Sequence, residues 1–135
     1  MRDGNSPLRG QPDGDAGSVH VLVARNRTRV VLHGEVDAAL AGDLKDAAAD
    51  AEASGRPIEV DARRVTFMDS SGFTLLARLA TRSPARLRVI EPPDVVRFLL
   101  EVTRISDLVE VVDVDPGFDD DPDGAPPEPP PDLVA

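Results

Sequence analysis

Cysteine is absent from this sequence of 135 residues, so the chain forms neither a disulfide framework nor a thiolate metal site. Tryptophan and tyrosine are also absent, and four phenylalanines supply the whole aromatic content of 3%. Aliphatic residues must therefore provide nearly all of the packing in any core. Because the chain gains nothing from an oxidising compartment, we expect a cytoplasmic protein.

Long apolar runs and clusters of positive charge are missing as well. Residues 1–17 contain no stretch that resembles a signal peptide, and nowhere do about 18 apolar residues follow one another as a membrane-spanning helix requires. The formal net charge is −10, and subtracting the seven acidic residues of 115–135, a segment without Lys or Arg, leaves −3 for the remainder. Without a basic stripe, direct binding to nucleic acid is not expected, and neither is membrane attachment.

The two ends of the chain differ in composition from its middle. Residues 1–17 and 115–135 are rich in Gly, Pro and Asp, which disfavour helices and central strands, so we expect two disordered tails. The segment 18–114 then forms a single domain, since 135 residues lie within the usual size of one domain.

Hydrophobic periodicity between the tails predicts five strands and three helices. An alternation of period two marks the strands, and apolar residues three or four apart mark the helices. The expected strands are Val19–Ala24, Thr28–His33, a short one at Ile58–Asp61, Leu87–Ile90 and Val109–Val114. The expected helices are Ala38–Ala53, one that starts at Ser70-Ser71-Gly72 and ends before Pro84, and one after Pro93 with Val95, Val96, Leu99, Leu100 and Val102 facing inward.

This order predicts an α/β fold, β-β-α-β-α-β-α-β. The first two strands are close enough in sequence to form an antiparallel hairpin. Strands separated by helices run parallel through right-handed crossovers, which gives a mixed, mainly parallel sheet covered by helices.

The segment Asp69-Ser70-Ser71-Gly72 lies where a strand ends and a helix begins. Asp and Ser are common helix caps, so hydrogen bonding to free N–H groups of the first turn is a sufficient structural explanation. Gly72 is less expected, because glycine costs about 1 kcal/mol against alanine inside a helix, which suggests that something approaches the backbone closely there. A functional alternative is that Ser70 is a modification site whose hydroxyl is exposed at the helix start.

Two motifs in this context resemble the STAS domain family (sulphate transporter and anti-sigma factor antagonist). Gly34-Glu35-Val36-Asp37 follows the second expected strand, and Val65-Thr66-Phe67-Met68-Asp69-Ser70-Ser71-Gly72 precedes the second expected helix. Bacterial anti-sigma factor antagonists commonly read G-E-[LV]-D and [FV]-[ILM]-D-S-S-G at these places, and the resemblance covers about residues 19–114. One departure is Phe73-Thr74, where the family usually has Leu-Gly.

The resemblance implies a site and a partner. Ser70 corresponds to the family's phosphorylation site, and Asp37, Asp69, Ser71, Gly72 and Phe73 would contribute to partner binding around it. The implied partner is an anti-sigma factor that is also a serine kinase using ATP. The unphosphorylated chain would bind this kinase and release a sigma factor, and phosphorylation would end the binding. No cofactor is implied, and the oligomeric state is left open.

Two other functions stay open at this point. A STAS interaction subunit outside sigma regulation, in a signalling scaffold or a transport complex, would carry the same motifs. An enzyme with Ser70 as nucleophile and Asp37 or Asp69 as base is less favoured, because no histidine is placed by sequence to activate the hydroxyl. A metal site is not expected either, since His20 and His33 lack nearby metal-binding partners in the sequence.

Overall fold

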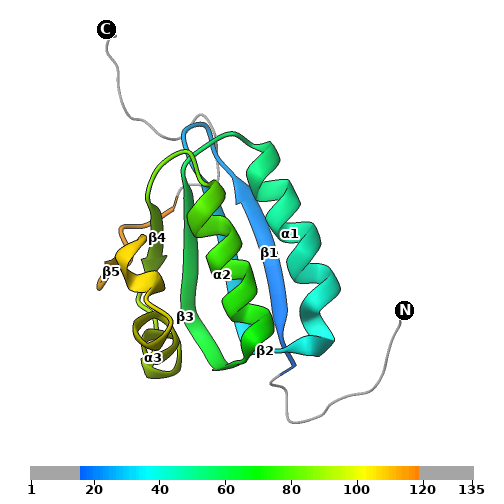
Figure 1. Ribbon diagram of the computed structural model, residues 1–135. Coiled ribbons are helices and arrows are strands. Elements are labelled where there is room, and N and C mark those ends of the chain that lie inside the picture. Colours follow the sequence, from blue (N-terminus) through cyan, green and yellow to red (C-terminus); the bar gives the residue numbers. More distant parts are fainter. Residues whose placement is uncertain (1–15, 119–135) are drawn as a thin grey trace, which may run out of the picture.

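The computed structural model describes residues 16–118 (Figure 1), and the greater part of both expected tails lies outside this range. The element order is the predicted one, with two short 3-10 turns added, Ala38–Leu40 before α1 and Ile105–Asp107 before β5. The strands are β1 Ser18–Val23, β2 Thr28–Val36, β3 Ile58–Met68, β4 Leu87–Ile90 and β5 Val109–Val112. The helices are α1 Ala41–Ala53, α2 Ser70–Arg82 and α3 Asp94–Val102.

The five strands form one sheet in the order β1-β2-β3-β4-β5. β1 pairs with β2 in antiparallel orientation, and the pairs β2–β3, β3–β4 and β4–β5 are parallel. Each parallel pair is joined through a helix, as a parallel connection requires. The predicted hairpin, the parallel pairings and the α/β fold class are therefore confirmed.

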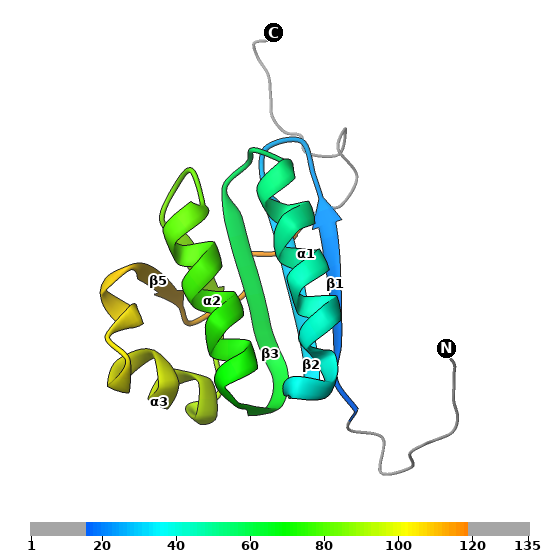
Figure 2. The ribbon, with the colours of Figure 1, turned by 45° about the vertical axis from the view of Figure 1, so that its right-hand side comes forward.

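The hydrophobic core lies between the helices and one face of the sheet. Val30 on β2 and Val60 on β3 are fully buried there against Leu76 of α2 and other aliphatic side chains from all three helices. Figures 1 and 2 show α1 and α2 side by side over this face. The expectation of a sheet covered by helices thus holds for one face. The opposite face carries charged residues, such as Arg29, Glu59 and Asp61, which alternate with the core residues along β2 and β3.

β3 is longer than the short strand expected from the sequence. It runs for 11 residues, but β4 pairs only with Glu59–Asp61, so the second half of β3 extends beyond β4. Its register with β2 shifts between Val31 and His33 and again after Gly34, whose φ of 75° is in the left-handed region that favours glycine. After these irregularities Val36 pairs with Met68, so both strands end at the same edge of the sheet.

Three expectations need correction. Val102, expected to face the core, is 56% exposed because only Val96 and Leu100 of α3 are fully turned inward. The last strand ends at Val112 and not at residue 114. Residues 115–118, assigned to the disordered tail, make hydrogen bonds to the sheet and belong to the folded domain. Side chains distant in sequence hold this segment, so composition alone could not indicate it.

Candidate functional site

The two sequence motifs meet at the carboxyl ends of β2 and β3. The Asp69 backbone N–H donates a hydrogen bond to the Val36 carbonyl at 3.1 Å, directly after the paired residues Val36 and Met68. Asp37 and Asp69 therefore each follow one of two neighbouring strand ends. The structure brings together Asp37 and the Asp69–Gly72 segment, as the sequence motifs predicted.

Both aspartates cap the turns that follow them. Asp69 has extended backbone angles, and its Oδ1 accepts a hydrogen bond of 2.7 Å from the Ser71 N–H, which makes it the N-cap of α2. Asp37 likewise accepts from the Ala39 N–H at 3.1 Å before the 3-10 turn that leads into α1. The capping explanation is confirmed for Asp69, and Ser70 is consequently the first residue of the helix.

Ser70 and Ser71 differ in what their hydroxyl groups can meet. Ser70 is exposed, and no group within residues 16–118 forms a hydrogen bond with its hydroxyl, although its carbonyl accepts from Thr74 Oγ1 at 2.8 Å. Ser71 is only half-exposed and turns toward α1. Of the two serines, Ser70 has the hydroxyl that an approaching protein reaches first.

Gly72 packs closely against a buried side chain. A Cβ atom at this position would lie 2.4 Å from Cγ and 2.9 Å from Sδ of Met68, which is itself 3% exposed. The close approach inferred from the sequence is therefore that of Met68 and not of an incoming molecule. Phe73 is also partly buried against the core, so it supports the helix start and leaves only part of its ring to solvent.

Phe67 is an exposed aromatic residue beside this site that the sequence interpretation did not single out. It lies two residues before Asp69, pairs in register with Glu35 on β2, and is 47% exposed. Residues 65–68 do not alternate strictly, since Val65 and Met68 are buried while Thr66 and Phe67 between them are exposed, so a period-two pattern alone does not single out Phe67. Exposed aromatic residues are enriched at protein-binding surfaces.

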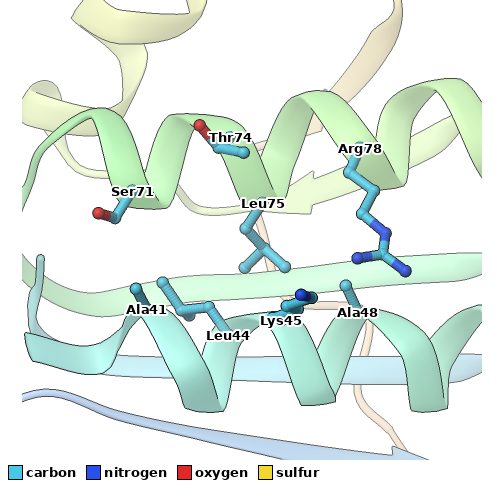
Figure 3. Close-up of a pocket in the computed structure, with 8 residues that line it drawn as sticks. All are labelled: Ala41, Leu44, Lys45, Ala48, Ser71, Thr74, Leu75 and Arg78. Carbon is cyan, nitrogen blue, oxygen red and sulfur yellow. The ribbon is translucent and has the colours of Figure 1, made fainter. Parts of the chain in front are cut away.

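A groove between α1 and α2 begins at Ser71 (Figure 3). It has a volume of about 400 Å³, and its lining combines an apolar floor with polar side chains, namely Ala41, Leu44, Lys45, Ala48, Ser71, Thr74, Leu75 and Arg78. Arg78 is held by two hydrogen bonds to Glu52 at 2.5 and 2.9 Å, and these hydrogen bonds lower the pKa of the Glu52 carboxyl. The groove extends the surface around the two serines along the helix pair.

Other kinds of site find little support in the part of the chain that the structure describes. His20 and His33 are exposed on β1 and β2, and neither forms a hydrogen bond with Ser70. No group of three or more His, Asp or Glu side chains within residues 16–118 is arranged to hold a metal ion. Among those residues, no helix has the length and apolar character needed to cross a bilayer.

Comparisons with known proteins give one family and one fold. A family model described as "Mlab, STAS domain" matches residues 19–110. An anti-sigma factor antagonist from Mycobacterium paratuberculosis has a similar structure, with a TM-score of 0.65 and 20% identity over 73% of this chain and 87% of that one. The anti-sigma factor antagonist SpoIIAA in its unphosphorylated form is similar too, with a TM-score of 0.56 and 20% identity over 70% of this chain and 88% of that one. No curated protein sequence matches the chain.

Proposed function

Because the chain belongs to the STAS domain family, we propose that it is an anti-sigma factor antagonist that binds an anti-sigma factor kinase and is switched off by phosphorylation at Ser70. The observation that carries this proposal is the exposed Ser70 hydroxyl at the start of α2, which no group within residues 16–118 engages. The two structural neighbours support it, since both are described as anti-sigma factor antagonists.

The docking surface consists of the residues around Ser70 at the carboxyl ends of β2 and β3. Asp37, Asp69 and Ser71 lie at the same edge of the sheet as Ser70, and Phe67 adds exposed aromatic area. A partner that covers this surface removes the Phe67 ring from water, and it seals the Ser70 side chain at the interface. Release of a sigma factor follows if the same surface of the kinase otherwise holds that sigma factor.

Phosphorylation changes this surface by charge. The kinase transfers the γ-phosphoryl group of ATP to Ser70 Oγ, so that an O–P bond forms, the bond from the γ-phosphorus to the bridging oxygen breaks, ADP leaves and the hydroxyl proton passes to a base on the kinase. The new group carries about −1.5 to −2 charges at neutral pH. The acidic N-cap Asp69 lies beside Ser70, but its carboxylate accepts a hydrogen bond from the Ser71 N–H, and the N-terminus of α2 stabilises an exposed anion by about 0.3–1 kcal/mol.

A docked partner responds differently from the free domain. Burying an unpaired charge at an interface costs about 2–5 kcal/mol, which exceeds the gain from the helix N-terminus. The domain therefore stays folded while the complex dissociates, and each 1.4 kcal/mol corresponds to about a tenfold loss of affinity. In this scheme the chain is the substrate of an enzyme and not a catalyst, it needs no cofactor, and it acts in the cytoplasm.

The test uses the full chain and a purified anti-sigma factor kinase with radiolabelled ATP. We expect label in the wild type and in Thr81→Ala, a control that removes an exposed hydroxyl near the other end of α2, but none in Ser70→Ala. Ser70→Ala should bind the kinase as tightly as the wild type, and Ser70→Asp should bind at least tenfold more weakly. Phosphate on Ser70→Ala, or equal binding of the phosphorylated and unphosphorylated chains, would remove Ser70 from this role.

A second candidate is a STAS interaction subunit outside sigma regulation, in a signalling scaffold or a transport complex. The description of the matching family model names a STAS domain without naming sigma regulation, which favours keeping this candidate. Affinity capture with the unphosphorylated chain separates the two. A captured partner with an ATPase-kinase domain supports the first proposal, and a partner without one supports the second.

A further inference from the structure

The face of the sheet opposite the helices carries a buried cluster of charges. Arg29 on β2 is 4% exposed, and Glu59 and Asp61 on β3 are 1% and 4% exposed. Arg29 Nε donates to Glu59 Oε2 at 2.7 Å, and its Nη1 lies 3.6 Å from Asp61 Oδ2. Charged groups are seldom buried unless specific partners replace the water around them, so we asked which residues cover this cluster.

Residues Asp115–Phe118, which we call the C-terminal strap, cover this cluster. Figure 2 shows the segment after β5 passing behind the sheet on the side away from the helices. The Asp115 carboxylate accepts from Arg29 Nη2 at 3.0 Å and pairs with Arg63 at 3.2 Å. The Phe118 ring centre lies 4.8 Å from the guanidinium carbon of Arg27 and 5.0 Å from that of Arg29. The domain therefore contacts two side chains of the strap, the carboxylate of Asp115 and, three residues later, the ring of Phe118.

The strap is attached to the sheet without extending it. Strand pairing ends at Val112, and the strap's backbone bonds to the domain are those from Arg27 Nη2 to the Gly117 carbonyl at 2.7 Å and from the Asp115 N–H to Glu91 Oε2 at 2.7 Å. Its departure would break no backbone pair of the sheet. Arg29 would keep Glu59 and Asp61 as partners, so the surface that the strap leaves, which we call the pocket, would keep these ion pairs.

One acceptor in the pocket is left without a hydrogen bond. The Glu59 side chain is 2% exposed, and its Oε1 atom is buried. The ion-pair partner of this oxygen is Arg88 Nη1, at 3.8 Å, whereas Arg29 binds the other oxygen, Oε2. Buried carboxylate oxygens are normally hydrogen-bonded, because an unsatisfied acceptor loses its hydration without replacement. The strap does not satisfy this oxygen, whereas a peptide that brings one more N–H or O–H donor would.

We propose that this pocket is a peptide-docking site for a segment with an acidic residue followed three positions later by an aromatic one, and that such a segment of a partner protein exchanges with the chain's own strap. Arginine guanidiniums that bind a carboxylate and stack on a ring give this pattern its selectivity. The pocket lies at the start of β3, about 30 Å along that strand from Ser70, and on the other face of the sheet. It is therefore independent of the proposed switch at Ser70.

The exchange is tested with the full chain and a fluorescein-labelled peptide that copies residues 112–118. In the variant Asp115→Asn/Phe118→Ala the strap loses both recognised groups, and we expect the peptide to bind at least tenfold more tightly than to the wild type in fluorescence anisotropy. The matched control is Asp113→Asn/Val114→Ala, which alters exposed neighbours of the strap and should behave like the wild type. A peptide with Asn and Ala in place of the acid and the ring should not bind.

A second measurement keeps the proposal testable if the double variant does not fold. In the wild type, excess unlabelled peptide should speed hydrogen exchange at the Asp115 N–H, which is bonded to Glu91, and leave the helix amides unchanged. The proposal is wrong if the peptide fails to bind a double variant that unfolds cooperatively, or binds all variants equally. Unchanged exchange at Asp115 under saturating peptide would also overturn it.

Discussion

The substitution Gly72→Ala tests the packing at the start of α2 most directly. The new Cβ would lie 2.4 Å from Met68 Cγ, whereas favourable carbon contacts lie at about 3.5–4.0 Å, so one of the two residues must move by about 1 Å or more. Overpacking of this kind in a buried site costs about 1–3 kcal/mol. The gain in helix propensity returns at most about 1 kcal/mol. We therefore expect a net loss of about 0–3 kcal/mol.

A matched glycine in α1 supplies the control. Gly42 also lies in the first turn of its helix, but a Cβ there would meet nothing within 4 Å. Gly42→Ala should therefore stabilise the domain by up to about 1 kcal/mol, through helix propensity alone. The same chemical change is thus expected to have opposite signs at the two positions.

Variants of Met68 show whether its contact with residue 72 causes the loss of stability in Gly72→Ala. Met68→Ala removes the Cγ atom, and although this costs about 2–5 kcal/mol by itself, Gly72→Ala added to it should now be neutral or stabilising. Met68→Leu keeps a Cγ atom, so Gly72→Ala should remain destabilising in that background. The two residues should be coupled by about 1–3 kcal/mol.

Urea unfolding followed by far-ultraviolet circular dichroism measures these free energies, since the chain has no tryptophan or tyrosine for intrinsic fluorescence. In a thermal scan, 1 kcal/mol corresponds to about 4–8 °C for a domain of this size. The reasoning fails if Gly72→Ala raises the midpoint as much as Gly42→Ala does, or if Met68→Ala leaves the effect of Gly72→Ala unchanged.

Two further predictions concern the helix cap and the acidic groups. Asp69→Ala removes the carboxylate that binds the Ser71 N–H and should cost about 0.5–2 kcal/mol in urea unfolding, whereas Ser70→Ala should stay within about 0.5 kcal/mol of the wild type. The pKa of Asp115 is lowered chiefly by the hydrogen bond from Arg29. Burial raises the pKa of Asp61, but the hydrogen bonds from Arg63 and the positive charges of Arg63 and Arg29 together outweigh it, so the pKa of Asp61 is lowered as well. A carboxyl whose pKa is lower in the folded than in the unfolded state stabilises the domain at pH values above its unfolded pKa of 3.8. The free energy of unfolding should therefore decrease as the pH falls below about 4 at constant ionic strength. The decrease should be smaller in Asp115→Asn. Stability that rises on acidification in this range would contradict the assignment.

The elements and their order could be predicted because their signals are local. The apolar spacing of Leu44, Ala47, Ala48 and Ala51 predicts α1, and all four side chains are buried in the structure. Asp69 before the run of α2 predicts a cap, which the structure confirms. The closeness of the two STAS motifs could also be predicted, because parallel strands joined by a helix end at the same edge of the sheet.

The surroundings of the site could be predicted only in part. Gly72 was noticed as unusual, but the atom that approaches it belongs to Met68, four residues earlier, and local pattern does not give the orientation of that side chain. The sequence indicates only that Phe67 belongs to a strand segment, whereas in the structure it is 47% exposed on a part of β3 that β4 does not reach. The groove at Ser71 depends on how far apart α1 and α2 lie, which neither helix determines alone.

By itself, the sequence determined the element order, the parallel pairing and the exposed serine at a helix start, since periodicity, caps and turn residues act between near neighbours. Only the tertiary structure decided what covers the second face of the sheet. Alternation along Ile58–Asp61 turns Glu59 and Asp61 away from the core. Their burial also requires Arg29 and the strap residue Asp115, which is 86 positions after Arg29 in the chain. Charges so distant in sequence come together only when the whole sheet has formed, because no local interaction specifies their distance.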